Sequence, residues 1–429
     1  MKTPIFDAVK AYSEKSAVRA HMPGHKGREM LGIEKYDLTE IDGLDVLYSA
    51  DGVILESENN ASELFCTEHT YYSAEGSTLA IKAMLAIAIM AEKSDTPPTV
   101  LAARNVHRAF VSAAALLDFK PIWLMGEGEH LCEGAVTPSD VRRALSEMER
   151  KPAAVYITSP DYLGNILDVQ GIARVCDEYS VPLLVDNAHG AYLAFLEPSR
   201  HPIALGAAMC ADSAHKTLPA LTGAAYLHVS KKYPHYTKWA RSYLSLFAST
   251  SPSYLILSSL DLINAYISDG YRDKLSTFIS RLDGVRERLN IRRCEPLKLV
   301  LDGSHSAALR DMGIECEFCD RDFTVLMLTP ENDSELDKIE SAISSLDMNT
   351  KKEVTKTSLS YPIEEMTVRE ASLSDFEEID ASEAEGRICA SLTVSCPPAV
   401  PIAISGEKIT GEHIFLFKRY GVGKIKVVK

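Results

Sequence analysis

Short apolar runs alternate with amphipathic helical patterns between about residues 75 and 230, and this alternation limits the fold more than any other sequence feature. Each apolar run is too short for a helix and is bounded by turn residues or charges. The alternation predicts an α/β fold, with a mainly parallel sheet covered by helices. The expected strands are 99–103, 121–125, 153–158, 181–185 and 223–229, and the expected helices are 77–92, 107–117, 138–149 and 169–178.

After residue 253 a long helical pattern runs to about residue 289, and there the texture of the chain changes to shorter elements. These are expected at 298–301, 304–311, 324–328 and 334–346, and a polar surface loop is expected at 349–357. We predict an N-terminal segment (1–60), a large domain (61–290) and a smaller α+β C-terminal domain (291–429). The sequence has no internal repeat or heptad run, which argues against a solenoid or coiled-coil scaffold.

Charge and hydropathy disfavour some classes of partner. The 429 residues carry a formal net charge of −15, which would repel nucleic acid and anionic lipid and attract a cationic substrate. The N-terminus lacks the apolar stretch of a signal peptide, and the apolar run at 79–91 contains Lys82 and is too short to span a bilayer. We therefore expect a cytoplasmic protein with no nucleic-acid or membrane partner.

The nine cysteines are odd in number and scattered, which is typical of reduced thiols and not of a disulfide framework. Cys316 and Cys319 form a C-x-x-C, but no second pair stands nearby to complete a zinc site. The surrounding β-type run makes this spacing an accident of a strand, and we expect no metal.

Four segments carry residues suited to chemistry at strand ends, where an open α/β sheet binds its ligand. In the first, Gly76, Ser77 and Thr78 lead into a helix. Glycine admits a close backbone approach, and the N–H groups, hydroxyls and helix dipole favour a phosphate. Taken alone, this segment equally fits an ordinary helix cap.

The second segment places Asp186 at the end of an apolar strand, with His189 three residues later. A buried carboxylate needs a cationic partner, and a protonated pyridine nitrogen is one. A metal ligand or a loop-capping aspartate would explain Asp186 equally well.

The third and fourth segments hold Lys216 and His107. Lys216 lies in a polar cluster before an apolar run, where a lysine suits an amine that condenses with an aldehyde, and the alternative is a solvated surface lysine. Ser213 and His215 flank it and could donate to a phosphate. His107 opens a helix after a strand, where it could stack on a flat ring or simply cap the helix.

With these segments in place, the chain resembles the Orn/Lys/Arg decarboxylase family of fold-type I, aspartate-aminotransferase-like pyridoxal-phosphate enzymes, in the short form without an N-terminal receiver-like domain. The resemblance covers nearly the whole chain, and so many ordered matches are more specific than any single motif. They are His21-Met22-Pro23-Gly24-His25-Lys26-Gly27, Asp37-Leu38-Thr39-Glu40, Gly43-Leu44-Asp45, Ser159-Pro160-Asp161-Tyr162-Leu163-Gly164, Ser249-Thr250-Ser251-Pro252-Ser253-Tyr254, Gly386-Arg387-Ile388, Pro397-Pro398 and Gly406-Glu407.

The resemblance implies roles for particular residues. Lys216 would hold pyridoxal 5′-phosphate as a Schiff base, Asp186 would pair with the ring nitrogen, and His107 would stack on the ring, with His189 beside it. The residues implied around the phosphate are Gly76, Ser77, Thr78, Ser213 and His215, with Thr250 or Ser251 from the neighbouring subunit of a homodimer. The candidates for substrate contact are His25, Tyr162 and Glu407.

The implied reaction removes the α-carboxylate of arginine, lysine or ornithine, through an external aldimine and a quinonoid, and releases the amine. One alternative is another pyridoxal-phosphate reaction, such as transamination or β-elimination, since a fold does not fix chemistry. The other is a binding protein without catalysis, against which the retention of Lys216, Asp186 and His107 argues. Arg387 is the arginine left open for the carboxylate-binding role that a transaminase needs.

Some positions depart from the family's pattern. Asn187 and Tyr192 replace the glutamate and the second histidine of a D-E-A-H-G-A-H loop, while Cys396 and Ala399 replace the tyrosine and the glycine of a Y-P-P-G-I-P run. These changes leave the cofactor residues intact and touch the surroundings from which substrate choice would come. The resemblance therefore predicts the cofactor but leaves the amino-acid substrate open.

Overall fold

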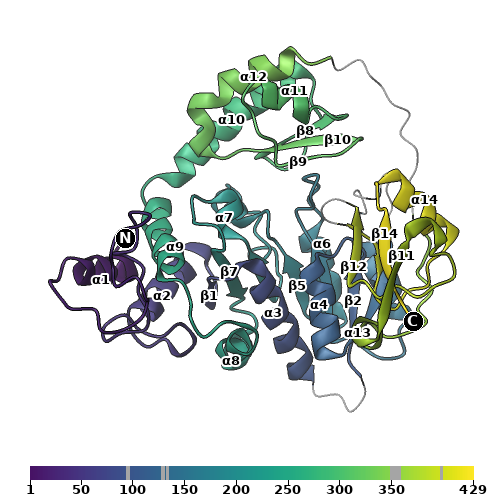
Figure 1. The fold of residues 1–429 in the computed structure, drawn as a ribbon, viewed down its shortest axis with the longest axis horizontal. Helices are drawn as coiled ribbons and strands as arrows, with labels where there is room; N and C mark the ends of the chain where they lie inside the picture. The colour runs from purple at the N-terminus through teal and green to yellow at the C-terminus, as the bar shows by residue number, and fades with distance from the viewer. Residues whose placement is uncertain (93–96, 127–130, 132–134, 348–358, 397–399) are drawn as a thin grey trace. The chain divides into compact units, whose positions relative to one another are not determined.

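The computed structural model describes residues 1–92, 97–126, 131, 135–347, 359–396 and 400–429 (Figure 1). Two compact units share the chain, and each combines two separate stretches of sequence. Unit 1 comprises Met1–Ala91 and Leu184–Ser276, and unit 2 comprises Glu92–Leu183 and Thr277–Lys429. This division follows contacts rather than sequence order, so the three-part division at residues 60 and 290 stays a prediction.

The strands of unit 1 are ordered β1 (His69–Ser73), β7 (Ala225–Val229), β6 (Met209–Asp212) and β5 (Leu183–Asp186). β5 and β6 are parallel, whereas β7 runs antiparallel to both β6 and β1. All residues of β5, β6 and β7 are buried, as expected for strands covered on both faces. Because β5 and β6 are parallel, their carboxyl ends, at Asp186 and Asp212, lie at the same edge of the sheet.

The helices of unit 1 surround these strands. They are α1 (Pro4–Ser13), α2 (Val53–Phe65), α3 (Gly76–Glu92), α7 (Ala214–Thr217), α8 (Thr237–Phe247), α9 (Tyr254–Ser268) and the first residues of α10 (Tyr271–Leu289), with the 3₁₀ helices η1 (Leu47–Ser49), η3 (Ala191–Phe195) and η4 (Pro234–Tyr236). In α3 the residues from Leu79 to Ile81 and from Ala83 to Ala88 are buried, and only the partly buried Lys82 interrupts them. A helix with so broad an apolar surface belongs in a core.

Asp45, in the Gly-Leu-Asp motif, precedes α2 and binds the backbone at the start of that helix. Its carboxylate accepts hydrogen bonds from the backbone N–H groups of Val46, Asp51, Gly52 and Ile54 at 2.7–3.2 Å. Burial opposes ionisation of Asp45, but these donors outweigh it and leave the pKa of the carboxyl below its ordinary value. This motif therefore has a structural reason, which is to satisfy N–H groups that the first turn of α2 leaves free.

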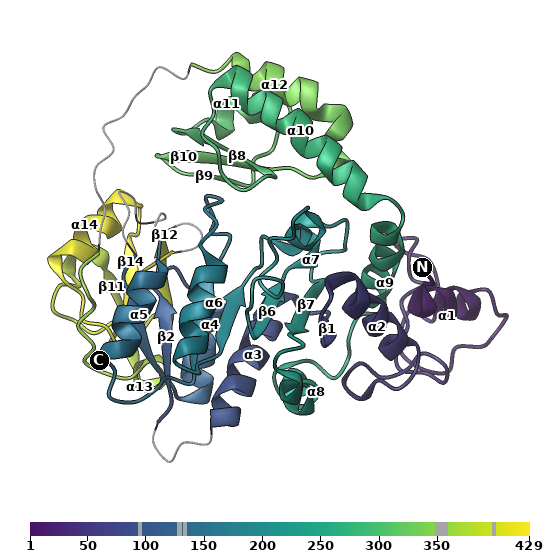
Figure 2. The same ribbon diagram turned by 180° about the vertical axis from the view of Figure 1, so that it is seen from behind.

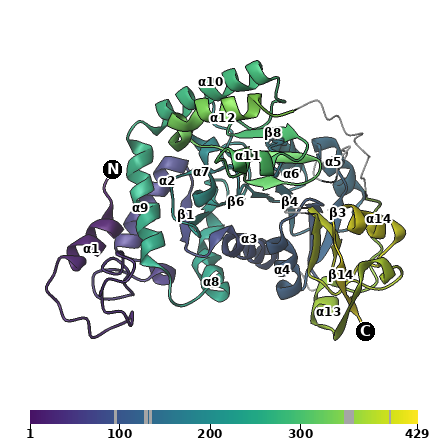
Figure 3. The same cartoon turned by 45° about the horizontal axis from the view of Figure 1, so that its top comes forward.

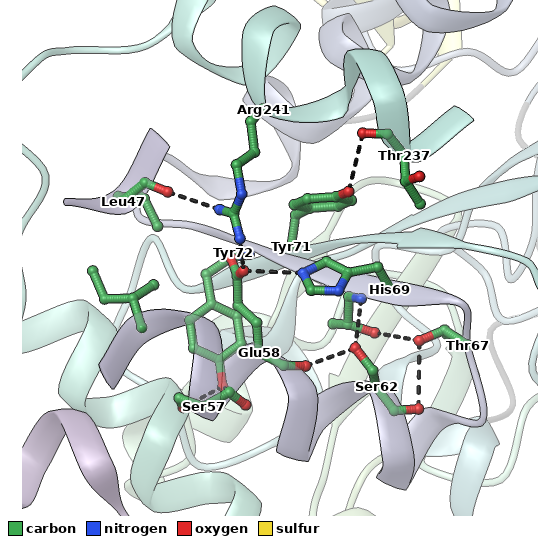
Figure 4. Close-up of polar contacts among 12 residues, drawn as sticks. Leu47, Ser57, Glu58, Ser62, Thr67, His69, Tyr71, Tyr72, Thr237 and Arg241 are labelled. Carbon is green, nitrogen blue, oxygen red and sulfur yellow. Dashed lines mark hydrogen bonds and ion pairs between the residues drawn. The ribbon is translucent and has the colours of Figure 1, made fainter. Parts of the chain in front are cut away.

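Glu58 fastens α2 to β1 and α8 (Figure 4). The side chain is fully buried, and its Oε2 accepts from Arg241 Nη2 at 2.6 Å and from His69 Nε2 at 3.1 Å. Its Oε1 accepts from the backbone N–H of Tyr72 at 3.0 Å. A buried acid with this many donors, one of them a guanidinium, is compensated within the protein.

Unit 2 contains the parallel strands β4 (Ala154–Thr158), β2 (Thr99–Ala103) and β3 (Lys120–Leu124), in that order. The helices α4 (Arg108–Leu117), α5 (Pro138–Glu147) and α6 (Val169–Glu178) accompany them (Figure 2). α5 begins with a capping box between Thr137 and Asp140, and α6 begins at Asp168, whose carboxylate accepts from Gly171 N–H. These caps explain why the apolar periodicity starts where it does.

The rest of unit 2 is built from small sheets and short helices. A sheet of order β8 (Lys298–Asp302), β10 (Phe323–Met327) and β9 (Phe318–Cys319) carries α10 and α12 (Leu336–Ser344) on one face (Figures 1 and 2). The remaining elements are α11 (Ser306–Asp311), η5 (Pro330–Glu335), α13 (Val368–Leu373), β11 (Phe376–Asp380) paired with β14 (Lys424–Val428), η6 (Ala381–Glu383), β12 (Thr393–Cys396) paired with β13 (Val400–Ile404), and α14 (Gly411–Arg419).

The sequence-based elements agree with the structure within a few residues for β2, β3, β4, β5 and β7 and for α3 to α6. The single helix expected from residue 253 to 289 is wrong, because α9 ends at Ser268 and α10 starts at Tyr271 (Figure 3). Gly270 has φ +76° and breaks the helix there. β1 and β6 were not predicted. The loop expected at 349–357 lies outside the described residues.

None of the helices in the described part of the chain combines the length and apolar character that crossing a bilayer requires.

Candidate active site

Lys216 lies on the short helix α7, which follows the end of β6. Its Nζ is 3.0 Å from Nε2 of His189, and the lysine is partly buried. His189, on the loop after β5, is itself buried, with 6% of its surface exposed. The structure therefore brings together the lysine and the histidine that the sequence placed on separate loops, and it gives the amine a neighbour that can hold or accept a proton.

Asp186 ends β5 beside these two residues in the fold and is 2% exposed. Its Oδ1 accepts from the backbone N–H of Ala188 at 3.1 Å. The parallel register sets Asp186 opposite Ala211, one residue before β6 ends, and Asn187 N–H donates to Ala211 O at 2.9 Å. These bonds fix the strand end from which the carboxylate projects.

Ser77 and Ser213 form a pair of hydroxyls at the start of α3, with Ser213 Oγ donating to Ser77 Oγ at 2.8 Å. Gly76 has φ +71°, and a side chain there would meet no atom within 4 Å, so the space beside this turn is open. Its N–H donates to Gly223 O at 2.7 Å, which anchors the turn to the loop before β7. The first-turn N–H groups of α3 lack intrahelical acceptors and suit a phosphate.

Two further phosphate candidates differ in their surroundings. Thr78 is exposed on α3. His215 is held by a bond of 2.9 Å from its Nδ1–H to Ala224 O. The donor set as a whole fits pyridoxal phosphate, because it combines an amine, a buried carboxylate at a neighbouring strand end, paired hydroxyls and a helix N-terminus.

The segment 249–251 lies next to the same turn of its own chain. Ser249 N–H donates to Glu75 Oε1 at 2.7 Å, and Ser251 N–H donates to Ser249 Oγ at 3.2 Å. Thr250 and Ser251 are exposed. Their expected reach into a neighbouring subunit stays a prediction.

His107 lies in unit 2, whereas Lys216 lies in unit 1. At least one role of His107 is structural. His107 caps α4, its Nδ1 accepting from Ala109 N–H at 3.2 Å, while the residue stays exposed. Stacking on the cofactor ring is not tested by this contact and stays a prediction.

The three candidate substrate residues each have a partner within the chain. His25 Nε2 is 3.2 Å from Asp37 Oδ2, and Tyr162 OH donates to Glu317 Oε1 at 3.0 Å. Glu407 accepts from Arg104 Nη1 at 2.6 Å and Nη2 at 2.9 Å, and the pair is buried. A substrate contact by Glu407 would have to share or replace this ion pair.

Sequence reasoning missed a buried polar cluster at the base of the site. Asp212, at the end of β6, accepts at Oδ2 from His201 Nε2 at 2.9 Å and from His228 Nε2 at 3.2 Å. Burial raises the pKa of Asp212, but the two imidazoles outweigh it and the pKa stays below its ordinary value. Burial also raises the pKa of the adjacent Cys210 thiol and lowers that of His228. The spacing of these residues in the sequence matches no motif from which the cluster could be predicted.

Solved structures of similar fold agree with the kind of site that the geometry indicates. A lysine decarboxylase from Francisella novicida superposes with a TM-score of 0.80 at 17% identity, covering 100% of this chain and 81% of that one. A serine palmitoyltransferase solved with bound pyridoxal phosphate gives a TM-score of 0.54 at 12% identity over 80% of this chain and 83% of its own. The fold is therefore that of the fold-type I pyridoxal-phosphate enzymes, as predicted.

Family models narrow this class. The major domain of Orn/Lys/Arg decarboxylases matches residues 3–305, and their C-terminal domain matches residues 351–419. An arginine decarboxylase from Bacillus subtilis (strain 168) is 28% identical over 98% of this chain and 94% of its own length. The chain belongs to the Orn/Lys/Arg decarboxylase family. It is a decarboxylase, and its cofactor is pyridoxal phosphate.

Proposed function

We propose that this enzyme removes the α-carboxylate of a basic L-amino acid at Lys216, and that L-arginine is its preferred substrate. The observation that carries the proposal is the pairing of Lys216 Nζ with His189 Nε2 at 3.0 Å, beside the strand end that bears Asp186. Support for arginine comes from relatives: those named arginine decarboxylase, from Bacillus subtilis and Bacillus anthracis, are 28% identical over at least 96% of this chain.

The residues of this chain divide the work among them. Bound pyridoxal phosphate supplies an aldehyde for covalent attachment and an electron sink for the pair that carbon dioxide leaves behind. Lys216 holds the cofactor between turnovers, and His189 takes or returns the proton of its amine as the substrate exchanges with it. Asp186 keeps a proton at the ring nitrogen, since its buried carboxylate stabilises a cation there.

The phosphate end of the site fixes the orientation of the ring. The Ser77 hydroxyl and the α3 N-terminus come from one element and the Ser213 hydroxyl from another, and the bond from Ser213 Oγ to Ser77 Oγ joins the two. The Gly76–Gly223 bond anchors the α3 turn to the loop before β7. These groups would hold the phosphate of pyridoxal phosphate and Asp186 its ring nitrogen, and a cofactor fixed in this way would give a constant plane against which the substrate is oriented, and that orientation decides which bond is broken. For His107 stacking, the support is the family resemblance.

The test is a panel of L-arginine, L-lysine, L-ornithine and L-glutamate, with carbon dioxide and the organic product both measured. In heavy water, decarboxylation should place one deuterium on the former α-carbon of the amine, which mass spectrometry detects. We expect carbon dioxide and the corresponding amine to form together, fastest from arginine. A keto acid without carbon dioxide would establish the transaminase alternative, and turnover of glutamate alone would refute a basic substrate.

We further propose that the enzyme works in the cytoplasm as a homodimer. The cysteines identified as free, including the C-x-x-C pair, suit a reducing compartment. The support for the dimer is the family resemblance of the segment from Ser249 to Tyr254 together with the need of a phosphate for many donors.

A further inference from the structure

His201, Cys210, Asp212 and His228 form a buried cluster that the decarboxylation chemistry does not use. Their four candidate donor atoms all lie within 4.8 Å of one another, and each residue is at most 1% exposed. Cys210 Sγ is 3.8 Å from His201 Nε2 and 3.8 Å from Asp212 Oδ1. The residues come from β6, β7 and the segment after η3, so a single ligand at their centre would join three elements of unit 1.

The chemistry of the four donors is that of a transition-metal site. A thiolate, two imidazoles and a carboxylate are the ligands that zinc takes in a closed tetrahedral structural site. Separations between donor atoms of about 3 to 4 Å are also what metal–ligand bonds of roughly 2.0 to 2.3 Å produce at tetrahedral angles. Asp212 Oδ2 lies 2.9 Å from His201 Nε2 and 3.2 Å from His228 Nε2, and Cys210 Sγ lies 3.8 Å from His201 Nε2, which is near that span. The four donors as a set lie within 4.8 Å of one another, so an ion would draw the widest pair closer.

A second set of hydrogen bonds orients these donors. His228 Nδ1 is 2.9 Å from Thr70 Oγ1, and Thr70 Oγ1 is 2.8 Å from Thr67 Oγ1. Ligating histidines commonly donate their other ring N–H in this way. Asn187 Nδ2 donates to Asp212 Oδ1 at 2.7 Å, which leaves Oδ2 facing both imidazoles. Nδ1 of His201 has no hydrogen-bond partner among the described residues. This nitrogen therefore favours neither the metal-bound nor the metal-free form of the cluster.

Charge gives a further reason. Within the described residues, Asp212 forms its ion pairs with His201 and His228, not with a lysine or an arginine. If both imidazoles are neutral, the cluster holds a carboxylate at 0% exposure without a full positive charge, which is costly. A divalent cation would remove that cost.

We propose that His201, Cys210, Asp212 and His228 bind one zinc ion that holds together the β6–β7 base of the Lys216 loop. On binding, the Cys210 thiol gives up its proton to solvent, and each imidazole shifts its single proton from Nε2, where it bonds to Asp212, to Nδ1, so that Nε2 becomes a ligand. The two anionic ligands then balance the charge of Zn²⁺, and no redox change occurs. Asn187 also fits this proposal, because a glutamate at this position would place a second negative charge beside Asp212 and repel it.

The first experiment measures metal in the pyridoxal-phosphate-loaded enzyme, purified without a polyhistidine tag and dialysed after supply of zinc. Mass spectrometry of the elements should give about one zinc ion per chain. Cobalt in place of zinc should add the absorption of a tetrahedral thiolate complex. A folded wild-type enzyme with less than about a tenth of an equivalent of zinc and no cobalt–thiolate absorption would overturn the proposal, and the cluster would then be a metal-free hydrogen-bond network.

Variants locate the ion. Cys210→Ser should lose the cobalt–thiolate absorption, while Cys176→Ser, which changes another buried cysteine outside the cluster, should keep it. Thr70→Val changes no zinc ligand but removes the hydroxyl that contacts His228 Nδ1 and Thr67 Oγ1. It should weaken zinc binding by roughly 10- to 100-fold in competition with a chelator. Should Cys210→Ser fail to fold, the wild-type metal content and Thr70→Val still decide. Wild-type absorption in Cys210→Ser would place the ion elsewhere and refute this site.

Discussion

A charged residue stands at each of two strand ends of this enzyme, and the two side chains have different kinds of partner. In unit 2, Arg104 follows β2, and both of its terminal nitrogens are bound, because its guanidinium makes a bidentate pair with Glu407 and lies 4.9 Å from the Trp123 ring. In unit 1, Asp186 ends β5 with a backbone N–H as a hydrogen-bond donor, beside the Lys216–His189 pair. A committed pair stabilises a fold, whereas groups that can still exchange partners and protons suit a ligand and its chemistry.

The largest effect should come from Lys216. Lys216→Ala should lower turnover by roughly ten-thousandfold, because the enzyme loses its covalent hold on the cofactor and the amine beside His189. Decarboxylation rates and the absorbance of the purified protein measure this. Lys231→Ala, which removes an exposed lysine, is the matched control and should behave like wild type. Normal turnover in Lys216→Ala would refute the contrast between the two strand ends, since the site beside Asp186 would then have no chemical role.

The next effect should be on stability and should come from unit 2. Glu407→Gln leaves the buried Arg104 guanidinium without its carboxylate and should lower the free energy of unfolding by about 3–5 kcal/mol. Urea denaturation measures it. The control is Glu315→Gln, which breaks an exposed pair with Arg310 and should change stability little.

Kinetics of Glu407→Gln sharpen the comparison further. If Glu407 only braces unit 2, KM for the amino acid should be unchanged in the folded variant. A large rise in KM at unchanged cofactor content would instead support the predicted role of Glu407 in substrate contact. Joint replacement of Arg104 and Glu407 by Met and Leu should restore much of the stability, because no buried charge then lacks a partner.

Asp186 should have a smaller effect than Lys216 on the same reaction. Asp186→Ala should still hold pyridoxal phosphate, but turnover should fall by about a hundredfold because nothing keeps the ring nitrogen protonated. Asp186→Glu keeps the carboxylate and should recover part of the loss. Turnover at the wild-type rate in Asp186→Ala, with full cofactor content, would reassign this carboxylate to capping the loop through Ala188.

The sequence predicts the elements that repeat a strong period. β2, β4 and β7 are apolar runs bounded by turn residues. In α6 both the helical period of apolar residues and the N-cap can be recognised within the local sequence. β1 is missed because His-Thr-Tyr-Tyr-Ser shows no such run. β6 lies within an apolar run, 207–211, but that run is rich in alanine, which has a low strand propensity. The strand character of β1 and β6 comes from pairing with β7, a tertiary contact that no local window contains.

The site divides in the same way. Asp186 is found from the sequence because it stands at a predictable strand end, and Lys216 because it stands in a polar cluster before the predictable strand β7. Both also lie within a family motif. The cluster of His201, Cys210, Asp212 and His228 is not, because its spacing matches no ligand pattern and one member lies inside β7. Only the antiparallel register of β6 and β7, which sets Cys210 opposite His228, brings these side chains together.

The last prediction concerns whether the active site belongs to one chain or two, and its expected signal, a partial recovery of activity, is the smallest of these changes. Ser249 N–H donates to Glu75 in its own chain, so the segment 249–251 already lies at its own phosphate turn and could serve it alone. The dimer proposal predicts instead that Thr250 and Ser251, both exposed, complete the partner's site. Chains carrying Lys216→Ala and chains carrying Thr250→Ala with Ser251→Ala should each be inactive or nearly so.

Mixing the two kinds of chain separates these possibilities. If sites are shared, half of the randomly formed dimers are hybrids with one working site in two, and activity should return to about a quarter of the wild-type value. Subunit exchange is demonstrated independently by mass spectrometry of differently labelled chains, with mixed Lys216→Ala and wild-type chains as the reference. Complete exchange without recovery would mean that each chain builds its phosphate site from its own residues, and the contact between Ser249 and Glu75 would then be the functional one.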